Sequence, residues 1–433
     1  MKRLRLMIAV LTAAVLLSGC RALSLYGPDI LTPPRASGGR AEIQHMIEED
    51  AGGGYTLIYP SSGDYKSGVL LYDLDHNGAE EAIALYASTG GSAKLLCAAS
   101  KGDAFSLIGS AELPSSNVNS LRFADVDGDG RDEIVVSCDA GAPIASLNAY
   151  LVGEELTRVR IAEGFTDFVT GDFDGDGAGD VLLLMPHSEN VTAKAILMSY
   201  SGGSFSGKSE IEIDSEVYFY DRLYFGALGK DVVGAAADGV LENGDHTTQL
   251  LCYDPGAKTL LNPLYIFSGY SDTRRSERVF SRDINDDGVI EYPLCDPMEA
   301  EKGADPASIC TRIVWCDYDY DQMLPDPVGS AIYCEPLGCM LMIRDELVDS
   351  LTARVEDGVM TVYSLSHKGA EPVVGAIQLT VKHYDHGSFD SSLIPEAVLY
   401  ESSTDVFTYI LPDKSVFTPD DVKNSFTLMN NTQ

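Results

Sequence analysis

The chain has 433 residues, a net charge of −36 and a hydrophobic content of 45%. The length suits two or three domains, and the hydrophobic content is that of a folded protein rather than a disordered one. Phosphate groups are bound by clustered Lys and Arg, so the acidity excludes nucleic acid as a partner. The acid either keeps a secreted protein soluble or supplies cation ligands.

The N-terminus has the pattern of a lipoprotein signal. Three basic residues precede an apolar run of about twelve residues, which suits a signal peptide and is too short to cross a bilayer. The run ends at Leu17-Ser18-Gly19-Cys20, which resembles a bacterial lipobox. The sequence therefore predicts a signal peptide over residues 1–19 and a diacylated Cys20. This lipid would anchor the protein at the extracellular face of a bacterial cell membrane.

The remaining cysteines leave two interpretations open. Outside the cytoplasm they can form disulfides, but most lie in apolar, strand-like runs that equally suit buried thiols. The lack of a Cys-x-x-Cys pair argues against a zinc or redox motif. These eight residues are Cys97, Cys138, Cys252, Cys295, Cys310, Cys316, Cys334 and Cys339.

Residues 20–54 are expected to hold the lipidated cysteine and a tether, with a short helix near 41–50. A repeat then occupies residues 55–334. Its first copy has strand candidates at 69–72, 82–86, 94–98 and 105–108, and an acidic loop follows the first of them. The loops recur at spacings of 52, 47 and 111 residues, and the doubled spacing predicts a copy without acids near 225–231. A period near 50 with four strands per unit predicts β-propeller blades.

Residues 335–433 lack acidic loops and are expected to form a separate α+β domain. Six strand candidates precede a helix start at Thr418-Pro419-Asp420-Asp421, where Thr is the N-cap and Pro takes the first position. We expect this helix to run through Val422, Phe426 and Met429. The predicted fold class is thus mainly β: a propeller of five to six four-stranded blades, with seven as the upper bound, followed by a small α+β domain.

Four nine-residue loops align without gaps and carry the clearest chemistry. Oxygen-bearing side chains occupy positions 1, 3, 5 and 9, and Gly occupies position 6, where a positive φ reverses the chain. Position 7 is expected to offer its backbone carbonyl. The expected ligands are Asp73, Asp75, Asn77, Ala79 and Glu81 in loop one; Asp125, Asp127, Asp129, Arg131 and Glu133 in loop two; Asp172, Asp174, Asp176, Ala178 and Asp180 in loop three; and Asp283, Asn285, Asp287, Val289 and Glu291 in loop four.

Six or seven hard oxygens per loop suit Ca²⁺ better than Mg²⁺, which demands a stricter octahedron. The sequence therefore predicts up to about four calcium ions. Loops two and three have four acids each, so they are expected to bind most strongly. An EF-hand would have Glu at position 12, where these loops have apolar residues.

The segment Asp125-Val126-Asp127-Gly128-Asp129-Gly130-Arg131-Asp132-Glu133 resembles an FG-GAP/VCBS repeat, the calcium-binding blade of integrin-α-like propellers. The resemblance covers residues 55–334 and implies that each loop joins the first two strands of its blade. It fails at 225–231, where the acids are missing. The chain as a whole also resembles lipid-anchored VCBS-repeat proteins of Gram-positive bacteria.

The sequence contains no His-Glu-x-x-His, Gly-x-Ser-x-Gly or phosphate-binding glycine loop. His383, Asp385 and His386 suit either a transition metal or, better, a solvated turn. Several aromatic residues suit either a glycan-binding surface or ordinary sheet positions: Tyr218, Phe219, Tyr220, Tyr224, Trp315, Tyr318 and Tyr320.

The first hypothesis is therefore a non-catalytic surface protein that binds or scaffolds a protein or glycan. The second is a polysaccharide lyase or glycosidase on a propeller scaffold, with its carboxylate pair hidden among the abundant acids. A role in envelope assembly through the C-terminal domain is a third.

Overall fold

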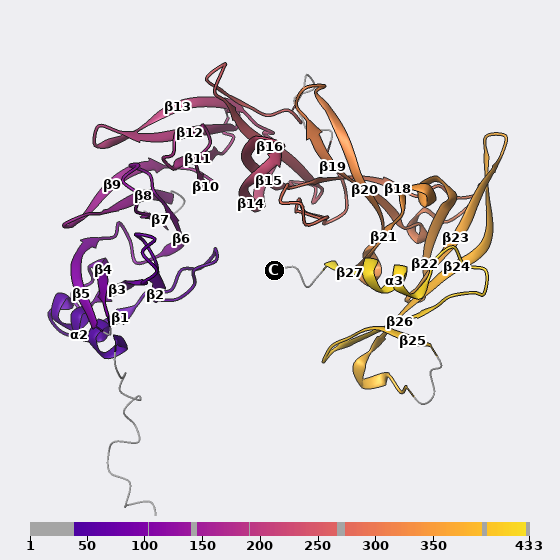
Figure 1. Cartoon of the computed structure of the whole chain (residues 1–433), viewed down its shortest axis with the longest axis horizontal. Coiled ribbons are helices and arrows are strands. Elements are labelled where there is room, and N and C mark those ends of the chain that lie inside the picture. Colours follow the sequence, from indigo (N-terminus) through magenta and orange to yellow (C-terminus); the bar gives the residue numbers. More distant parts are fainter. Residues whose placement is uncertain are drawn as a thin grey trace, which may run out of the picture. The chain divides into compact units, whose positions relative to one another are not determined.

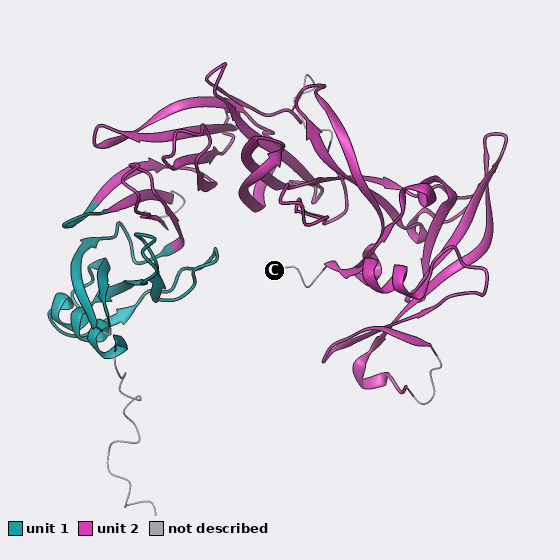
Figure 2. Cartoon of the chain, in the orientation of Figure 1, with its two compact units in different colours: residues 1–118, 152–157 teal, residues 119–151, 158–433 magenta. Residues whose placement is uncertain are grey.

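The computed structural model describes residues 39–102, 104–139, 145–189, 191–265, 273–391 and 396–429 (Figure 1). The predicted signal peptide and Cys20 lie outside these residues. Within the described part of the chain, no helix has the length and apolar character needed to cross a membrane. The chain divides into two compact units, residues 1–118 with 152–157 and residues 119–151 with 158–433 (Figure 2), and each is described by itself.

The first unit combines a helix with the first sheet. Its elements are α2 (Gly39–Ala51), β1 (Tyr55–Leu57), β2 (Val69–Tyr72), β3 (Glu81–Ser88), β4 (Ala93–Lys101) and β5 (Ala104–Glu112). The sheet order is β1-β3-β4-β5, and β2 also pairs with β3.

Helix α2 is part of the folded unit rather than of a tether. Ile43 and Ile47, one turn apart, are buried in one cluster with Tyr86 and Leu96 of the sheet. Asp50 in the last turn accepts hydrogen bonds from Lys94 Nζ at 2.7 Å, from Ser110 Oγ at 2.6 Å and from the Tyr86 hydroxyl. Among the described residues, the folded part thus begins at Gly39, inside the segment 20–54 that the sequence assigned to the anchor and tether.

Three four-stranded antiparallel sheets follow in chain order. They contain β6 (Val118–Ala124), β7 (Glu133–Asp139), β8 (Ala145–Val152) and β9 (Leu156–Glu163); β10 (Asp167–Gly171), β11 (Asp180–Met185), β12 (Lys194–Ser201) and β13 (Ser204–Glu212); and β14 (Val217–Gly229), β15 (Val232–Leu241), β16 (His246–Asp254) and β17 (Thr259–Leu261). Strands next to each other in the chain pair in each sheet, so each sheet is a simple meander. The third sheet has only a short turn between β14 and β15, as expected for the copy without acids.

The next sheet has the order β18-β19-β20-β21-β27, with β18 (Tyr292–Pro297), β19 (Thr311–Asp319), β20 (Leu324–Cys334), β21 (Cys339–Ile343) and β27 (Phe426–Leu428). The last sheet has the order β22-β23-β24-β26-β25, with β22 (Leu351–Glu356), β23 (Val359–Lys368), β24 (Glu371–Asp385), β25 (Ala397–Glu401) and β26 (Asp405–Ile410). Short 3-10 helices lie at Pro306–Ser308, Glu335–Leu337, Asp345–Ser350 and His386–Ser388. Because β21 pairs with β20, this sheet crosses the domain boundary expected at residue 334.

The C-terminal helix begins where the sequence predicts but ends early. Thr418 caps α3 (Pro419–Ser425), and its side chain and that of Asp421 exchange hydrogen bonds with each other's backbone N–H, a capping box. The prediction that Phe426 and Met429 continue the helix is wrong. Phe426 begins β27, which pairs with β21, and its ring packs 5.3 Å from that of Phe407. Sheet pairing and aromatic packing outweigh the helical spacing.

In the second unit, consecutive meanders share their cores. Val135 and Leu147 of the β6–β9 sheet are buried with Val181 and Leu183 of the β10–β13 sheet. On the other face of the latter sheet, Leu182 joins side chains of the β14–β17 sheet. Four-stranded meanders stacked face to face in chain order are the blades of a β-propeller, so the predicted fold class is confirmed.

Candidate metal centres

The acidic loops lie at equivalent places in their sheets. Loops one, two and three join β2 to β3, β6 to β7 and β10 to β11, so each links the first two strands of its meander. Position 9 is the first residue of the second strand in all three. In loop four, Glu291 directly precedes β18, and the strand before the loop is reduced to a single bridge between Arg282 and Glu291.

The aspartate at position 1 organises each loop. One carboxylate oxygen accepts a hydrogen bond from the N–H of the position 6 glycine, at 2.8–3.0 Å in all four loops. The other accepts from the N–H at position 5 in loops one, two and four, at 3.0–3.2 Å. The glycines at position 6 have φ values of 88° to 90°, as the turn requires. The loop conformation is thus held by its own side chains.

In three of the loops, the glutamate at position 9 is hydrogen-bonded to the start of the same loop. One oxygen of Glu81, Glu133 and Glu291 accepts a hydrogen bond from the N–H at position 2, at 3.0, 2.9 and 2.8 Å respectively. All three side chains are buried. The second oxygen of Glu291 is buried without a hydrogen-bond partner, as is one oxygen of Asp180 in loop three. Buried carboxylate oxygens without a partner are costly unless a cation binds them.

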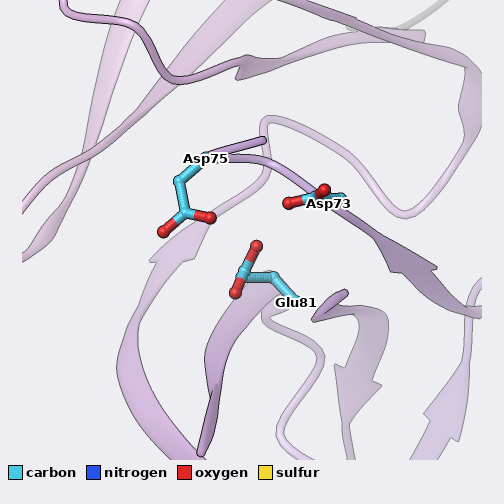
Figure 3. A group of neighbouring side chains, drawn as sticks. All are labelled: Asp73, Asp75 and Glu81. Carbon is cyan, nitrogen blue, oxygen red and sulfur yellow. The ribbon is translucent and has the colours of Figure 1, made fainter. Parts of the chain in front are cut away.

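Three carboxylates converge in every loop. The converging side chains are Asp73, Asp75 and Glu81; Asp125, Asp127 and Glu133; Asp172, Asp174 and Asp176; and Asp283, Asp287 and Glu291. Within each set the candidate ligand oxygens lie within 4.8 Å of one another. Oxygens that share one Ca²⁺ at about 2.4 Å are at most about 4.8 Å apart, so each loop fits this ion. Figure 3 shows the carboxylates of loop one facing a common space.

The electrostatics of the loops also favour a cation. Burial, together with the charges of Asp127, Asp129 and Asp125, raises the pKa of Glu133 to about 8. Burial raises the pKa of Glu291 to about 7 and that of Asp180 to about 6, with nearby carboxylates adding to both. The ionised carboxylates therefore repel one another in the absence of a counter-charge.

The backbone conformation at position 4 was not predicted when the four loops were aligned with one another. This position has a left-handed backbone in all four loops: Gly128 and Gly175 in loops two and three, and His76 and Asp286, with φ of 54° and 62°, in loops one and four. The glycine shared by loops two and three was the available signal. The non-glycine residues are uncommon in this conformation, which shows that the turn geometry is kept against residue preference.

The loops also join neighbouring sheets. The N–H of Gly179, at position 8 of loop three, donates a hydrogen bond of 2.5 Å to the carbonyl of Asp125, at position 1 of loop two. Likewise, the N–H of Ile290 in loop four donates at 2.9 Å to the carbonyl of Ala227, near the end of β14. A cation that fixes the loop conformation therefore also fixes this contact between sheets.

Loops three and four differ in the side chains around position 9. Asp180 is one methylene shorter than Glu, and it accepts a hydrogen bond from Ser199 Oγ of β12. Lys208 of β13 forms an ion pair with Asp174. Beside loop four, Asp317 and Asp326 are paired residues of β19 and β20, and one oxygen of Asp317 is buried without a hydrogen-bond partner. The count of acids within the loops alone therefore misses the charges that the strands add.

The other candidate residues have ordinary structural surroundings. His383 Nε2 pairs with Asp405 at 2.7 Å and His386 Nε2 with Glu401 at 3.1 Å, so the two rings serve different carboxylates. Trp315 and Tyr318 are buried sheet residues, whereas Tyr218 and Phe219 are 72% and 42% exposed. The eight cysteines from Cys97 to Cys339 are free thiols, all buried except the half-buried Cys295.

The fold and the loops thus define a protein of propeller-type blades with four acidic loops. No protein-family model matches the chain, and no curated protein matches it. Among solved structures, it is similar to the Dos1 propeller at 13% identity, with a TM-score of 0.32 over 79% of this chain and 83% of that one. It is also similar to BBS1N, from its crystal structure in complex with ARL6DN, at 11% identity, with a TM-score of 0.29 over 83% of this chain and 98% of that one.

Proposed function

We propose that this chain is a lipid-anchored surface protein of the FG-GAP/VCBS type, whose calcium-stabilised blades form a non-catalytic module that binds or scaffolds a protein or glycan. Cys20 would carry the lipid, and the module would face the outside of a bacterial cell. The observation that carries the proposal is the convergence of three carboxylates in each of four equivalent loops. Such repetition at sheet connections suits stabilisation rather than a single reaction centre.

In this proposal, Ca²⁺ acts on the fold. The side-chain oxygens at positions 1, 3, 5 and 9, with the backbone carbonyl at position 7, would bind the ion. The ion would neutralise the repulsion within a loop that binds it and hold the contacts between Gly179 and Asp125 and between Ile290 and Ala227. Because it binds the folded state, it adds stability by mass action.

An exposed aromatic pair supports a binding role. Tyr218 and Phe219 are neighbours on β14, with ring centroids 6.0 Å apart and edge-to-face geometry. Exposed aromatic rings offer rigid, apolar area to a partner at a low entropic cost, as in many protein interfaces. Three residues along the strand, Asp221 of β14 forms an ion pair of 3.2 Å with Arg278, which lies on the segment after β17.

The experiment is a glycan array and a pull-down from the native envelope, both with the calcium-loaded protein. A double variant, Tyr218→Ala with Phe219→Ala, should lose most of the captured ligand. The matched control is Tyr59→Ala, which removes a tyrosine that is 63% exposed elsewhere. Release of new reducing ends from pectin or host glycans would overturn the proposal in favour of an enzyme.

A further inference from the structure

The third acidic loop is paired with a lysine from a neighbouring strand, and among the described residues the ion pairs to its acids all come from this lysine. Lys208 Nζ forms an ion pair with Asp174 and lies 3.9 Å from an oxygen of Asp176 and 3.9 Å from an oxygen of Asp180. Its side chain is 23% exposed, and the ammonium also lies 5.5 Å from the centre of the Tyr253 ring. One ammonium thus meets three of the four acids of this loop.

A β-bulge places Lys208 there. Leu197 pairs with Ser209 and Met198 pairs with Gly207, so Lys208 is the extra residue of β13 between them. A bulge inserts one unpaired residue and changes the direction of its side chain. The placement of the ammonium therefore follows from the backbone of the sheet.

The same bulge recurs in the sheets of loops one and four. Its extra residue is Ile108 in β5 and Val328 in β20. In each of these sheets, the bulge lies at the same register position relative to the position 9 acid, so Ile108 and Val328 are equivalent to Lys208. Of these three bulge positions, those beside loops one and four are thus apolar, and that of loop three carries a charge.

We propose that the Lys208 ammonium is the resident cation of loop three, so that this loop takes no Ca²⁺ while loops one, two and four do. This inference rests on the proposed calcium function. Because the ammonium is tethered to the sheet, it acts at a high effective concentration. To bind, Ca²⁺ would have to displace the ammonium from Asp174, and the two positive charges would then repel each other at short range. Asp180, which is shorter than Glu and accepts a hydrogen bond from Ser199, suits a loop whose cation is the Lys208 ammonium.

The four loops would therefore respond differently to calcium. The contact from Gly179 to the Asp125 carbonyl joins loop three to loop two, and the lysine would hold the loop-three side of it at any calcium concentration. Calcium would then control the other three loops. The four acids of loop three, which the sequence ranks among the strongest binders, are instead matched by a built-in charge.

The test is the number of calcium ions bound per chain, measured by equilibrium dialysis of metal-free protein against radioactive calcium. The wild type should bind three ions, and Lys208→Met, which keeps the chain length without the charge, should bind four. Lys208→Arg keeps the charge and should stay at three. The reciprocal variant Val328→Lys should close loop four and bind two.

The outcomes separate this inference from the proposed function. Four ions in the wild type, with no change in Lys208→Met, would overturn the role of Lys208 and leave the calcium proposal intact. No bound calcium in any variant would overturn both. Loss of an ion in Val328→Lys alone, without a gain in Lys208→Met, would also contradict the inference.

Discussion

The carboxylate at position 9 is where burial and charge oppose each other most strongly. Glu133 is 1% exposed, yet its side chain must be ionised to bind a cation. In Glu133→Gln, the amide oxygen keeps an acceptor for the Val126 N–H, so the loop should stay folded while the charged ligand is lost. Bound calcium should fall by one ion per chain. At calcium concentrations near 100 times Kd, the lost stabilisation is about 2.7 kcal/mol.

The measurement is urea unfolding with and without calcium, with Glu242→Gln, an exposed acid outside the loops, as the control. Without calcium, Glu133→Gln should be at least as stable as the wild type, because a buried charge has been removed. A variant that is less stable only in the absence of calcium would contradict this role for Glu133.

The raised pKa values of the loop carboxylates give the pH dependence a definite sign. The pKa of Glu133 is about 8 and that of Glu291 about 7 in the calcium-free fold, against 4.5 for an unperturbed Glu. Their contribution to the stability of the calcium-free protein is therefore full below pH 4.5 and is lost as the pH rises through 7 and 8. Calcium needs the ionised form, so its stabilising effect should grow over the same interval.

Melting curves of metal-free protein, with and without added calcium chloride, test this at several pH values. The gain in Tm on adding calcium should be small near pH 5 and largest near pH 8. A gain that is constant across this range would contradict the assignment of the raised pKa values to the calcium ligands.

At the residue scale, the sequence predicts the loop ligands well because they are local. Positions 1, 3, 5, 6 and 9 lie within nine residues, and their hydrogen bonds are made inside the same segment. Lys208 escapes such reasoning because it lies 34 residues from Asp174 and reaches it through a bulge in another strand. The same holds for Asp317, which is brought near loop four by sheet register.

At the scale of elements, one buried ion pair holds the segment that leads to loop four. The side chains of Arg275 and Asp238 of β15 are fully buried and 3.3 Å apart. The guanidinium also donates to the carbonyls of Val279 and Thr273, and Asp238 accepts from Thr248 and Ser281. This network ties residues 273–281 to the β14–β17 sheet.

Arg275→Met should therefore destabilise the fold by about 3–5 kcal/mol, because it leaves the buried Asp238 charge unpaired. The control is Arg278→Met: its ion pair with Asp221 is 3.2 Å long but the arginine is 66% exposed, so about 0–1 kcal/mol is expected. Urea unfolding at saturating calcium measures both. Equal effects of the two substitutions would show that the buried network does not fix this segment.

The strands are the elements that the sequence predicts best. Apolar runs such as 82–86 and 94–98 lie inside β3 and β4 because each is long enough to fill a buried strand between turns. The ends of helices were harder to predict. The apolar residues of α2 pack on the first sheet, and α3 ends where Phe426 begins β27. In both cases the contacting strands are distant in sequence, so the local pattern does not indicate them.

At the scale of the whole chain, the period of the acidic loops predicts the order of the sheets, including the one without acids. The boundary at residue 334 was not predictable in the same way. The predicted repeat ends there, but the sheet continues through β21 and receives β27 from the C-terminal part of the chain. A repeat signal reports where a motif stops, and hydrogen-bond pairing decides where a sheet stops.

The most direct test of the account is thermal unfolding of the protein in calcium and after chelation with EGTA at pH 8. Three loops that lose their ions leave buried carboxylates such as Glu133 and Glu291 without a counter-charge, so the Tm should fall clearly on chelation and recover when calcium is restored. A melting curve that EGTA leaves unchanged would contradict the claim that calcium stabilises the blades.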